Sequence, residues 1–132
     1  AHHPTELRAT LAAARAAYPG RRIVAAFQPH LYSRTRDFAD DFGEALATGG
    51  DVALLTDIYK ARETPIAGVS SQLIADAAAA AGRPVHWAGL RADVTDALVA
   101  TVRPGDVVLT LGAGDITAVG PELLARLGAP RA

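Results

Sequence analysis

A short polar loop that follows an apolar run carries the richest side-chain chemistry in the chain. His30, Tyr32, Ser33 and Arg34 present an imidazole, a phenol, a hydroxyl and a guanidinium within five residues. The guanidinium offers a planar fork of donors that suits a carboxylate or a phosphate. An amphipathic helix is predicted to follow these residues, and a helix N-terminus favours anions. The loop therefore predicts a site for an anionic group.

A less specific interpretation of the same loop stays open. Arg34 and Arg36 can be solvated, or they can pair with Asp37, Asp40 and Asp41 on the same helix. Such ion pairs between neighbouring turns need no ligand, so the spacing alone does not choose between a surface ion pair and an anion site.

A second polar loop covers residues 57–69 and lacks helical or strand periodicity. It follows a predicted strand and includes Asp57, Tyr59, Arg62 and Glu63. A loop of this length in a compact domain is often functional, and a solvated surface loop is the alternative.

A third loop, Gly112-Ala113-Gly114-Asp115, follows another apolar run. Its glycines allow close approach of a ligand or a tight turn from strand to helix. It is not the dinucleotide-binding fingerprint, because Thr117 stands where the third glycine of G-x-G-x-x-G falls. Asp115 is expected to cap the helix that follows.

The predicted elements that position these loops alternate between strand and helix. Strands are expected at residues 23–27, 52–56, 85–88 and 106–111, and helices at 5–18, 36–48, 71–81, 93–102 and 116–127, with Gly120-Pro121 as a break in the last. Right-handed crossovers place all the strands in one parallel sheet with helices on both faces. The polar loops then share the carboxyl edge of the sheet, where ligands bind in open α/β folds.

The composition restricts the class of protein. The chain has 132 residues, half of them apolar, which suits one folded domain. A net charge of −1 without a long basic run speaks against nucleic-acid binding as the main function. No apolar run approaches the roughly 20 residues of a membrane span, and no signal peptide is visible. A soluble, cytoplasmic protein without membrane contact is therefore expected.

Two residue counts exclude particular chemistries. The chain has no cysteine, which excludes disulfides, thiolate metal sites and a cysteine nucleophile. Lys60 is the only lysine, and no Gly-Lys-Ser or Gly-Lys-Thr sequence occurs. ATP chemistry that uses a P-loop lysine therefore cannot be done by this chain alone.

Adjacent histidines at the start of the chain allow three interpretations. His2 and His3 can be a fragment of a purification tag, helix-capping residues, or ligand contacts at a domain hinge. Two adjacent histidines are a poor metal site by themselves, because no third ligand lies at a set spacing.

Several motifs, in chain order, resemble the C-terminal domain of the Mur ligase family. They are residues 1–6 (Ala-His-His-Pro-Thr-Glu), 27–30 (Phe-Gln-Pro-His), 32–36, 57–59 with Glu63 and 65–66, and 112–116. The Gln-Pro-His loop is quite specific among these ligases, whereas the Gly-Ala-Gly-Asp turn is not. One position departs from the pattern: Leu31 stands where an arginine often precedes the tyrosine, which puts more weight on Arg34.

The resemblance implies a Rossmann-like α/β domain with three layers, a mainly parallel sheet and helices on both faces. It implies, in particular, an ATP-dependent ligase that joins L-alanine to UDP-N-acetylmuramate through an acyl phosphate, in the synthesis of peptidoglycan precursors. Residues 1–132 would be the C-terminal domain, which closes over the nucleotide and positions the amino acid. The UDP-binding and ATPase domains would then lie outside this chain. ATP and Mg²⁺ are expected in the full-length enzyme and not on this domain alone, which is expected to be inactive.

The same resemblance implies which residues form the site. His30, Tyr32 and Arg34 would face the amino acid and the acyl phosphate, and His2 would lie near the nucleotide. The expected substrate-binding residues are His30, Tyr32, Arg34, Asp57, Tyr59, Glu63, Gly114 and Asp115, with no catalytic residue and no metal ligand.

Three other functions are compatible with the sequence. One is a sister ligase that adds a different amino acid, including folate-polyglutamate synthases, and the Gln-Pro-His loop argues against it. Another is a free-standing module that holds a nucleotide or a phosphorylated ligand without catalysis. The third is a structural domain that contributes only an interface, whose loops would tolerate alanine.

Overall fold

The computed structural model of the protein describes residues 3–128 as alternating helices and strands. The helices are α1 (Pro4–Ala17), α2 (Tyr32–Gly49), α3 (Gln72–Ala80), α4 (Val94–Thr101) and α5 (Val119–Gly128). The strands are β1 (Ile23–Phe27), β2 (Val52–Thr56), β3 (Trp87–Gly89) and β4 (Val107–Leu111), and short 3₁₀ turns are η1 (Arg91–Asp93) and η2 (Asp115–Ala118). None of these helices is long and apolar enough to cross a membrane.

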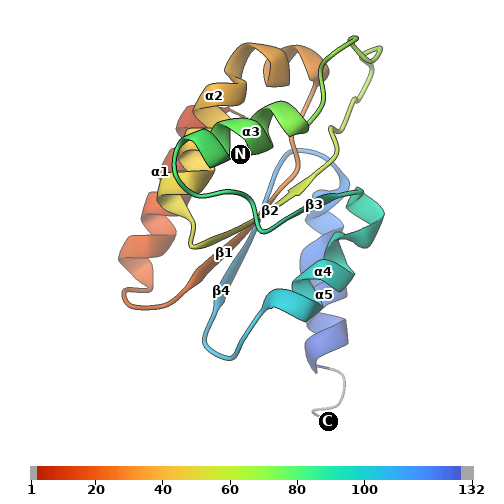
Figure 1. The fold of residues 1–132 in the computed structure, drawn as a ribbon. Helices are drawn as coiled ribbons and strands as arrows, with labels where there is room; N and C mark the ends of the chain where they lie inside the picture. The colour runs from red at the N-terminus through yellow and green to blue at the C-terminus, as the bar shows by residue number, and fades with distance from the viewer. Residues whose placement is uncertain (1–2, 129–132) are drawn as a thin grey trace.

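The strands of the described chain form one parallel sheet in the order β3-β2-β1-β4 (Figure 1). β1 pairs with β4 from Ile23 opposite Val107, and with β2 from Val24 opposite Val52. Every residue of β1 is buried, as its uninterrupted apolar run predicted. The α/β class and the single parallel sheet expected from the sequence are confirmed.

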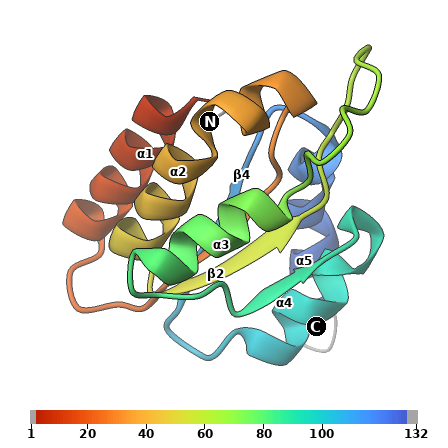
Figure 2. The same cartoon turned by 45° about the horizontal axis from the view of Figure 1, so that its top comes forward.

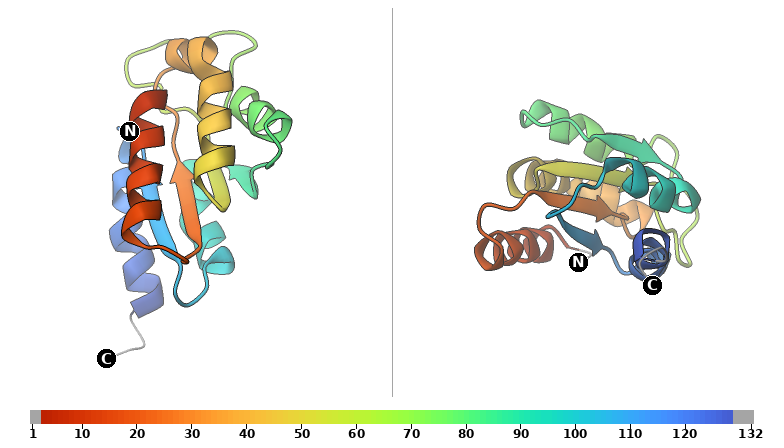
Figure 3. Two further views of the ribbon diagram at one scale, coloured as in Figure 1. Left: turned by 90° about the vertical axis from the view of Figure 1, so that its left-hand side faces the viewer. Right: turned by 90° about the horizontal axis from the view of Figure 1, so that it is seen from below.

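Helices cover both faces of the sheet, which makes three layers (Figures 2 and 3). One face packs α1, α2 and α3 against Ile23, Ala25 and Phe27, and the other packs α4, η2 and α5 against Val24 and Ala26. Successive side chains of a strand point to opposite faces, so β1 contributes to both cores. Because burying a large apolar side chain stabilises a fold by about 1.5–3 kcal/mol, this strand anchors both helical layers.

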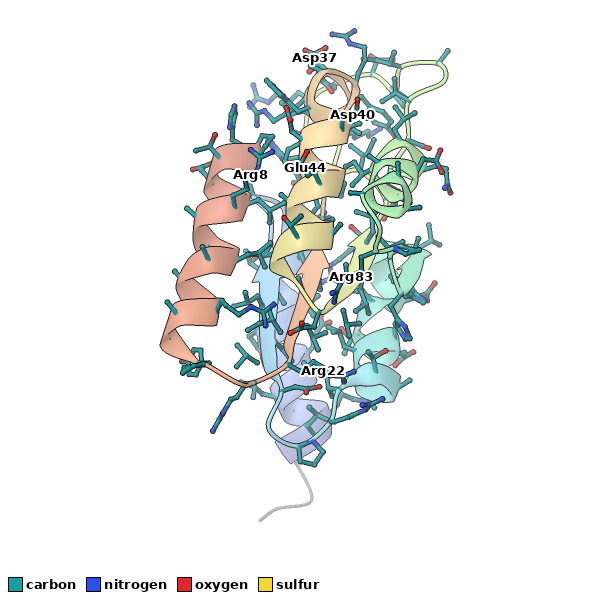
Figure 4. All side chains as sticks on the ribbon, turned by 60° about the vertical axis from the view of Figure 1, so that its left-hand side comes forward. Arg8, Arg22, Asp37, Asp40, Glu44 and Arg83 are labelled. Carbon is teal, nitrogen blue, oxygen red and sulfur yellow. The ribbon has the colours of Figure 1, made fainter. Side chains whose placement is uncertain are left out.

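Arginine–carboxylate pairs tie the strands together at the amino edge of the sheet, the end at which Figure 4 shows Arg22. Arg22 donates to Asp106 through Nε at 3.1 Å and Nη2 at 2.7 Å. These hydrogen bonds hold the pKa of Asp106 below its ordinary value. Arg15 donates to Asp51 at 2.8 Å, and the same carboxylate accepts the N–H of Ile23 at 2.8 Å. The starts of β1, β2 and β4 are therefore held by charged residues that directly precede the strands.

Among the elements that begin at other residues than the periodicity predicted are β3 and α2. β3 begins at Trp87 and not at residue 85, and its register with β2 runs from Trp87 opposite Leu54 to Gly89 opposite Thr56. α2 begins at Tyr32 and not near Arg36, and it carries a kink at Phe38, where φ is −125°.

The expectation that Asp115 caps the last helix is wrong. The segment begins as the 3₁₀ turn η2 and continues as α5 from Val119, with no cap hydrogen bond from the Asp115 side chain. The Asp115 carboxylate accepts a hydrogen bond from Gln28 instead. Pro121 lies in the first turn of α5, where its missing N–H has no helical partner to lose.

We expect Gly43→Ala to lower the free energy of unfolding by about 2 kcal/mol. A Cβ at Gly43 of α2 would lie 2.4 Å from the Cβ of Ala77 and 2.6 Å from the amide nitrogen of Ala78, so α2 and α3 would have to move apart. Glu44→Ala, at the neighbouring exposed position, is the control and should change that free energy by less than about 0.5 kcal/mol. Urea denaturation measures both variants. Equal stabilities would show that the two helices can separate without loss.

Candidate functional site

The loops that follow β1 and β2 continue to pair beyond the ends of the strands. The N–H of Leu31 donates to the carbonyl of Tyr59 at 2.9 Å, and the N–H of Tyr59 donates to the carbonyl of Pro29 at 2.8 Å. The rings of His30 and Tyr59 stack, with centroids 5.7 Å apart and planes inclined by 14°. Polar residues of the two loops are therefore held side by side at the carboxyl edge of the sheet.

A pocket of about 420 Å³ lies at this edge, where the loops after β1, β2, β3 and β4 meet. It is lined by Gln28, Tyr32, Asp57, Ile58, Tyr59, Lys60, Ala61, Arg91 and Asp115. The structure thus brings together half of the expected substrate-binding residues: Tyr32, Asp57, Tyr59 and Asp115. The others, His30, Arg34, Glu63 and Gly114, lie outside the lining.

Arg91 connects two carboxylate residues of the pocket wall. Its backbone N–H donates to Oδ1 of Asp57 at 2.9 Å. Its Nε and Nη2 donate to the backbone carbonyl of Asp115 at 3.2 Å and 3.1 Å. The sequence reasoning missed this residue. The available signal was its position shortly after a predicted parallel strand, whose carboxyl end must reach the same edge.

Gly114 contributes to the site through its lack of a side chain. A Cβ there would lie 2.5 Å from Cγ of Tyr59 and 2.7 Å from Oε1 of Gln28. The glycine backbone therefore packs against the Tyr59 ring and does not line the pocket. Of the two interpretations of these glycines, close approach to a ligand or a tight turn from strand to helix, the contacts support the tight turn, because Gly114 packs against residues of the chain itself.

The N-terminus of α2, where the sequence predicted an anion, receives a carboxylate of the same chain. The N–H of Ser33 donates to Oε1 of Glu63 at 3.1 Å, and the Ser33 hydroxyl donates to Oε2. These hydrogen bonds, with Arg36 nearby, hold the pKa of Glu63 below its ordinary value. The N-cap residue itself, Leu31, has a φ of 72° and no side-chain oxygen, so Glu63 supplies the cap from another loop. This distant cap explains the early start of α2.

The two arginines of this first turn have different surroundings. Arg36 pairs with Asp37 at 2.9 Å on the surface, so the interpretation as a solvated ion pair holds for Arg36. Arg34 is partly buried and has no ion-pair partner within residues 3–128. Its guanidinium therefore keeps its full capacity to bind an anionic ligand.

His3 caps α1. Its Nδ1 accepts the N–H of Thr5 at 3.3 Å, and its ring lies 5.0 Å from that of Phe38. The capping interpretation is confirmed for this histidine. His2 lies outside the described residues, so its contact with a nucleotide stays a prediction.

The pocket wall combines charges of both signs, with Asp57 and Asp115 against Lys60 and Arg91. No group of three His, Cys, Asp or Glu residues within 3–128 is placed to hold a metal ion. A wall of this kind suits a small molecule that itself carries both charges, or one that carries a phosphate. Its chemistry is to bind and orient such a molecule.

The chain is similar to known proteins over nearly its whole length. Residues 1–114 match the family described as Mur ligase, glutamate ligase domain. A UDP-N-acetylmuramate–L-alanine ligase of Cutibacterium acnes is 56% identical over 96% of this chain. Another ligase of the same name, from Streptomyces avermitilis, is 50% identical over 96% of the chain. The chain spans 27% of the length of each of these relatives.

Solved structures share the fold. A murein peptide ligase of Psychrobacter arcticus superposes with a TM-score of 0.75 and 22% identity, over 97% of this chain and 26% of that one. A ligase domain from Haemophilus ducreyi gives a TM-score of 0.69 and 22% identity, over 96% of this chain and 85% of that one. At this identity the likeness concerns the fold alone.

We expect Glu63→Ala to weaken hydrogen-exchange protection in the first turn of α2, because the Ser33 N–H loses its acceptor. The folded-state pKa of Glu63 is lowered, so its stabilisation is complete above the ordinary value of 4.5 and is lost as the pH falls through the lowered pKa. Wild-type protection should therefore approach that of the variant in acid. NMR hydrogen exchange measures both proteins.

The control is Arg62→Ala, an exposed change in the same loop. It should leave the protection of α2 unchanged at every pH. If Glu63→Ala behaves like this control, the carboxylate does not cap the helix.

Proposed function

Because the chain belongs to the Mur ligase family, whose glutamate ligase domain matches residues 1–114, we propose that it is the C-terminal domain of a UDP-N-acetylmuramate–L-alanine ligase. In this proposal residues 1–132 form that domain, and the UDP-binding and ATPase domains belong to other parts of the enzyme. The full enzyme takes L-alanine, UDP-N-acetylmuramate and ATP, and acts in the cytoplasmic synthesis of peptidoglycan precursors.

The observation that carries the proposal is the high identity, over nearly the whole chain, with ligases of this one name. The position of the pocket supports it. Loops from the carboxyl ends of parallel strands form the wall, which is where an open α/β domain binds its ligand.

The charges of the site suit L-alanine. This amino acid offers an ammonium group, a carboxylate and one methyl group, so charge-assisted hydrogen bonds must supply most of its recognition. In the proposal the guanidinium of Arg34 binds the carboxylate, because it is partly buried and has no ion-pair partner among the described residues. Asp115 of the pocket wall binds the ammonium group. Tyr32 lies two positions before Arg34 and joins the helix to the pocket.

The proposed reaction has two steps. The lactyl carboxylate of UDP-N-acetylmuramate attacks the terminal phosphorus of ATP, which releases ADP and forms an acyl phosphate. The ammonium group of L-alanine then loses a proton to water, the resulting amine attacks the acyl carbon, and inorganic phosphate leaves. This domain contributes by holding the amine in line with that carbon, which converts a bimolecular step into one within a complex. Its closure over the other domains would exclude water from an intermediate that water can hydrolyse.

ATP and Mg²⁺ act with the full enzyme in this proposal. At the pocket, the ammonium of Lys60 suits a phosphate group of the nucleotide, whereas the guanidinium of Arg91 is already engaged by Asp115 and Glu122. The described residues offer no cluster of carboxylates for the cation, so its ligands are assigned to the other domains. ATP supplies the phosphoryl group that activates the carboxylate.

In the full ligase, Arg34→Ala should raise the KM for L-alanine about tenfold to a hundredfold and change kcat much less. The reason is the loss of a hydrogen-bonded charge pair, worth about 1.5–3 kcal/mol. Steady-state kinetics with varied L-alanine measures the effect. Arg36→Ala is the matched control, because Arg36 already pairs with Asp37 on the surface, and its KM should be unchanged. An unchanged KM for Arg34→Ala would remove Arg34 from the site.

Addition of millimolar L-alanine to this chain should shift amide NMR signals of residues 30–34 and 112–115 and leave those of α1 in place. The two segments lie at one edge of the sheet, so a ligand bound there perturbs both. A separate titration with ATP and Mg²⁺ tests the competing function. Shifts with ATP and none with L-alanine would favour a nucleotide-binding module over a domain that positions an amino acid.

A further inference from the structure

Gln28, the first residue of the Gln-Pro-His motif, has no part in the function proposed above, although it lies where β1 ends and the pocket begins. It is 2% exposed. A buried amide loses its hydrogen bonds to water, so it is stable only where both its donor and its acceptor find partners. Its partners therefore indicate what it does.

Both ends of the amide bond to the segment that follows β4. Nε2 donates to Oδ1 of Asp115 at 2.7 Å, and Oε1 accepts the N–H of Ile116 at 3.1 Å. The backbone N–H of Gln28 donates to the carbonyl of Leu111 at 2.9 Å. The orientation of the amide is thus determined, because its nitrogen faces a carboxylate and its oxygen faces an N–H.

The turn after β4 is shaped to lie against this residue. Gly112 has a φ of +148°, which other residues rarely adopt, and a Cβ there would lie 2.9 Å from the carbonyl oxygen of Gln28. Together with Gly114, it lets the backbone pass close to the amide. The close fit places Asp115 within reach of Nε2.

Asp115 is the residue whose freedom this arrangement restricts. Its side chain is 59% exposed, and an exposed carboxylate ordinarily samples several rotamers. Here Nε2 of Gln28 donates to Oδ1, Nε of Arg91 lies 3.6 Å from the same oxygen, and Arg91 also donates to the backbone carbonyl of Asp115. Within residues 3–128, Oδ2 makes no hydrogen bond, so it is available to a ligand in the pocket.

We infer that Gln28 is a positioning residue, which fixes the Asp115 carboxylate in the orientation that receives the ammonium group of the amino-acid substrate. The inference rests on the proposed function for the identity of that substrate. An amide is required at this position. Glutamate would bring two carboxylates within hydrogen-bond distance of each other, and methionine would leave the Ile116 N–H without its acceptor.

The first test compares Gln28→Met with Gln72→Met. Gln72 on the exposed face of α3 makes the same kind of bond, from Nε2 to Oδ1 of Asp76 at 2.8 Å, and it is therefore a matched control. In this chain, NMR measures the Hα–Hβ couplings of Asp115 and the exchange rate of the Ile116 amide. Gln28→Met should average those couplings and speed that exchange, whereas Gln72→Met should change neither.

In the full ligase, Gln28→Met should raise the KM for L-alanine about tenfold, with a smaller change in kcat and in the KM for ATP, because it loosens one charged contact of the amino acid. Gln72→Met should leave all three constants unchanged. If the Asp115 couplings are averaged but the KM for L-alanine is unchanged, Gln28 only stabilises the turn after β4. If the Asp115 couplings are unchanged, Gln28 does not position the Asp115 carboxylate.

The double variant Gln28→Glu with Asp115→Asn separates the hydrogen bonds from the charge. The carboxylate introduced at position 28 can accept from the amide introduced at position 115 and from the Ile116 N–H. Slow exchange of the Ile116 amide should therefore return, while the KM for L-alanine should stay raised, because the carboxylate at position 115 is lost. A KM that returns to the wild-type value would refute the role given to the Asp115 charge.

The positioning and the proposed function can fail separately. A wild-type ligase that forms no product with L-alanine would overturn the proposed function itself. The couplings of Asp115 in this chain test the positioning independently of that result, because they need neither the other domains nor a substrate.

Discussion

The parallel pairing of β1 with β2 on one side and β4 on the other is the constraint on which the rest of the structure depends. β1 lies inside the sheet and is buried along its whole length, so its side chains serve two cores at once. A shift of the pairing by one residue would turn Phe27 and its neighbours to the wrong face. With this register, and with every described strand parallel, the loops that follow the strands must meet at one edge, and the pocket lies there.

The loops at that edge are hydrogen-bonded to one another. Gln28 bonds the segment after β4, Tyr59 pairs with the loop after β1, and Arg91 joins Asp57 to Asp115. Groups that are already ordered lose less conformational entropy when a ligand binds. The hydrogen-bonded pocket wall therefore favours binding of a small molecule that can make only a few contacts. The carboxyl edge is thus held by hydrogen bonds between its loops, from both backbone and side chains, whereas the amino edge is held by arginine–carboxylate pairs.

The guanidinium of Arg34 takes no part in this network. The first turn of α2 is held by the Glu63 carboxylate, yet the guanidinium of Arg34 in the same turn has no ion-pair partner within residues 3–128. In the proposed function this guanidinium is the group that binds the carboxylate of L-alanine. The pocket wall contains two carboxylates and two cations, which suits a small molecule that carries both charges or one that carries a phosphate.

Local sequence patterns were sufficient to predict the helices and strands, because helical and strand periodicity depend on neighbours a few positions apart. From these elements followed the single parallel sheet and the edge at which half of the expected site residues meet. Other features depend on contacts between distant parts of the chain. Glu63 caps a helix through Ser33, 30 positions away, and Gln28 bonds Asp115, 87 positions away. Such bonds exist only once the register of the whole sheet is in place, since that register brings the loops within hydrogen-bond distance. For this reason the tertiary structure alone decided three features: the early start of α2, the place of Arg91 in the pocket wall and the orientation of Asp115.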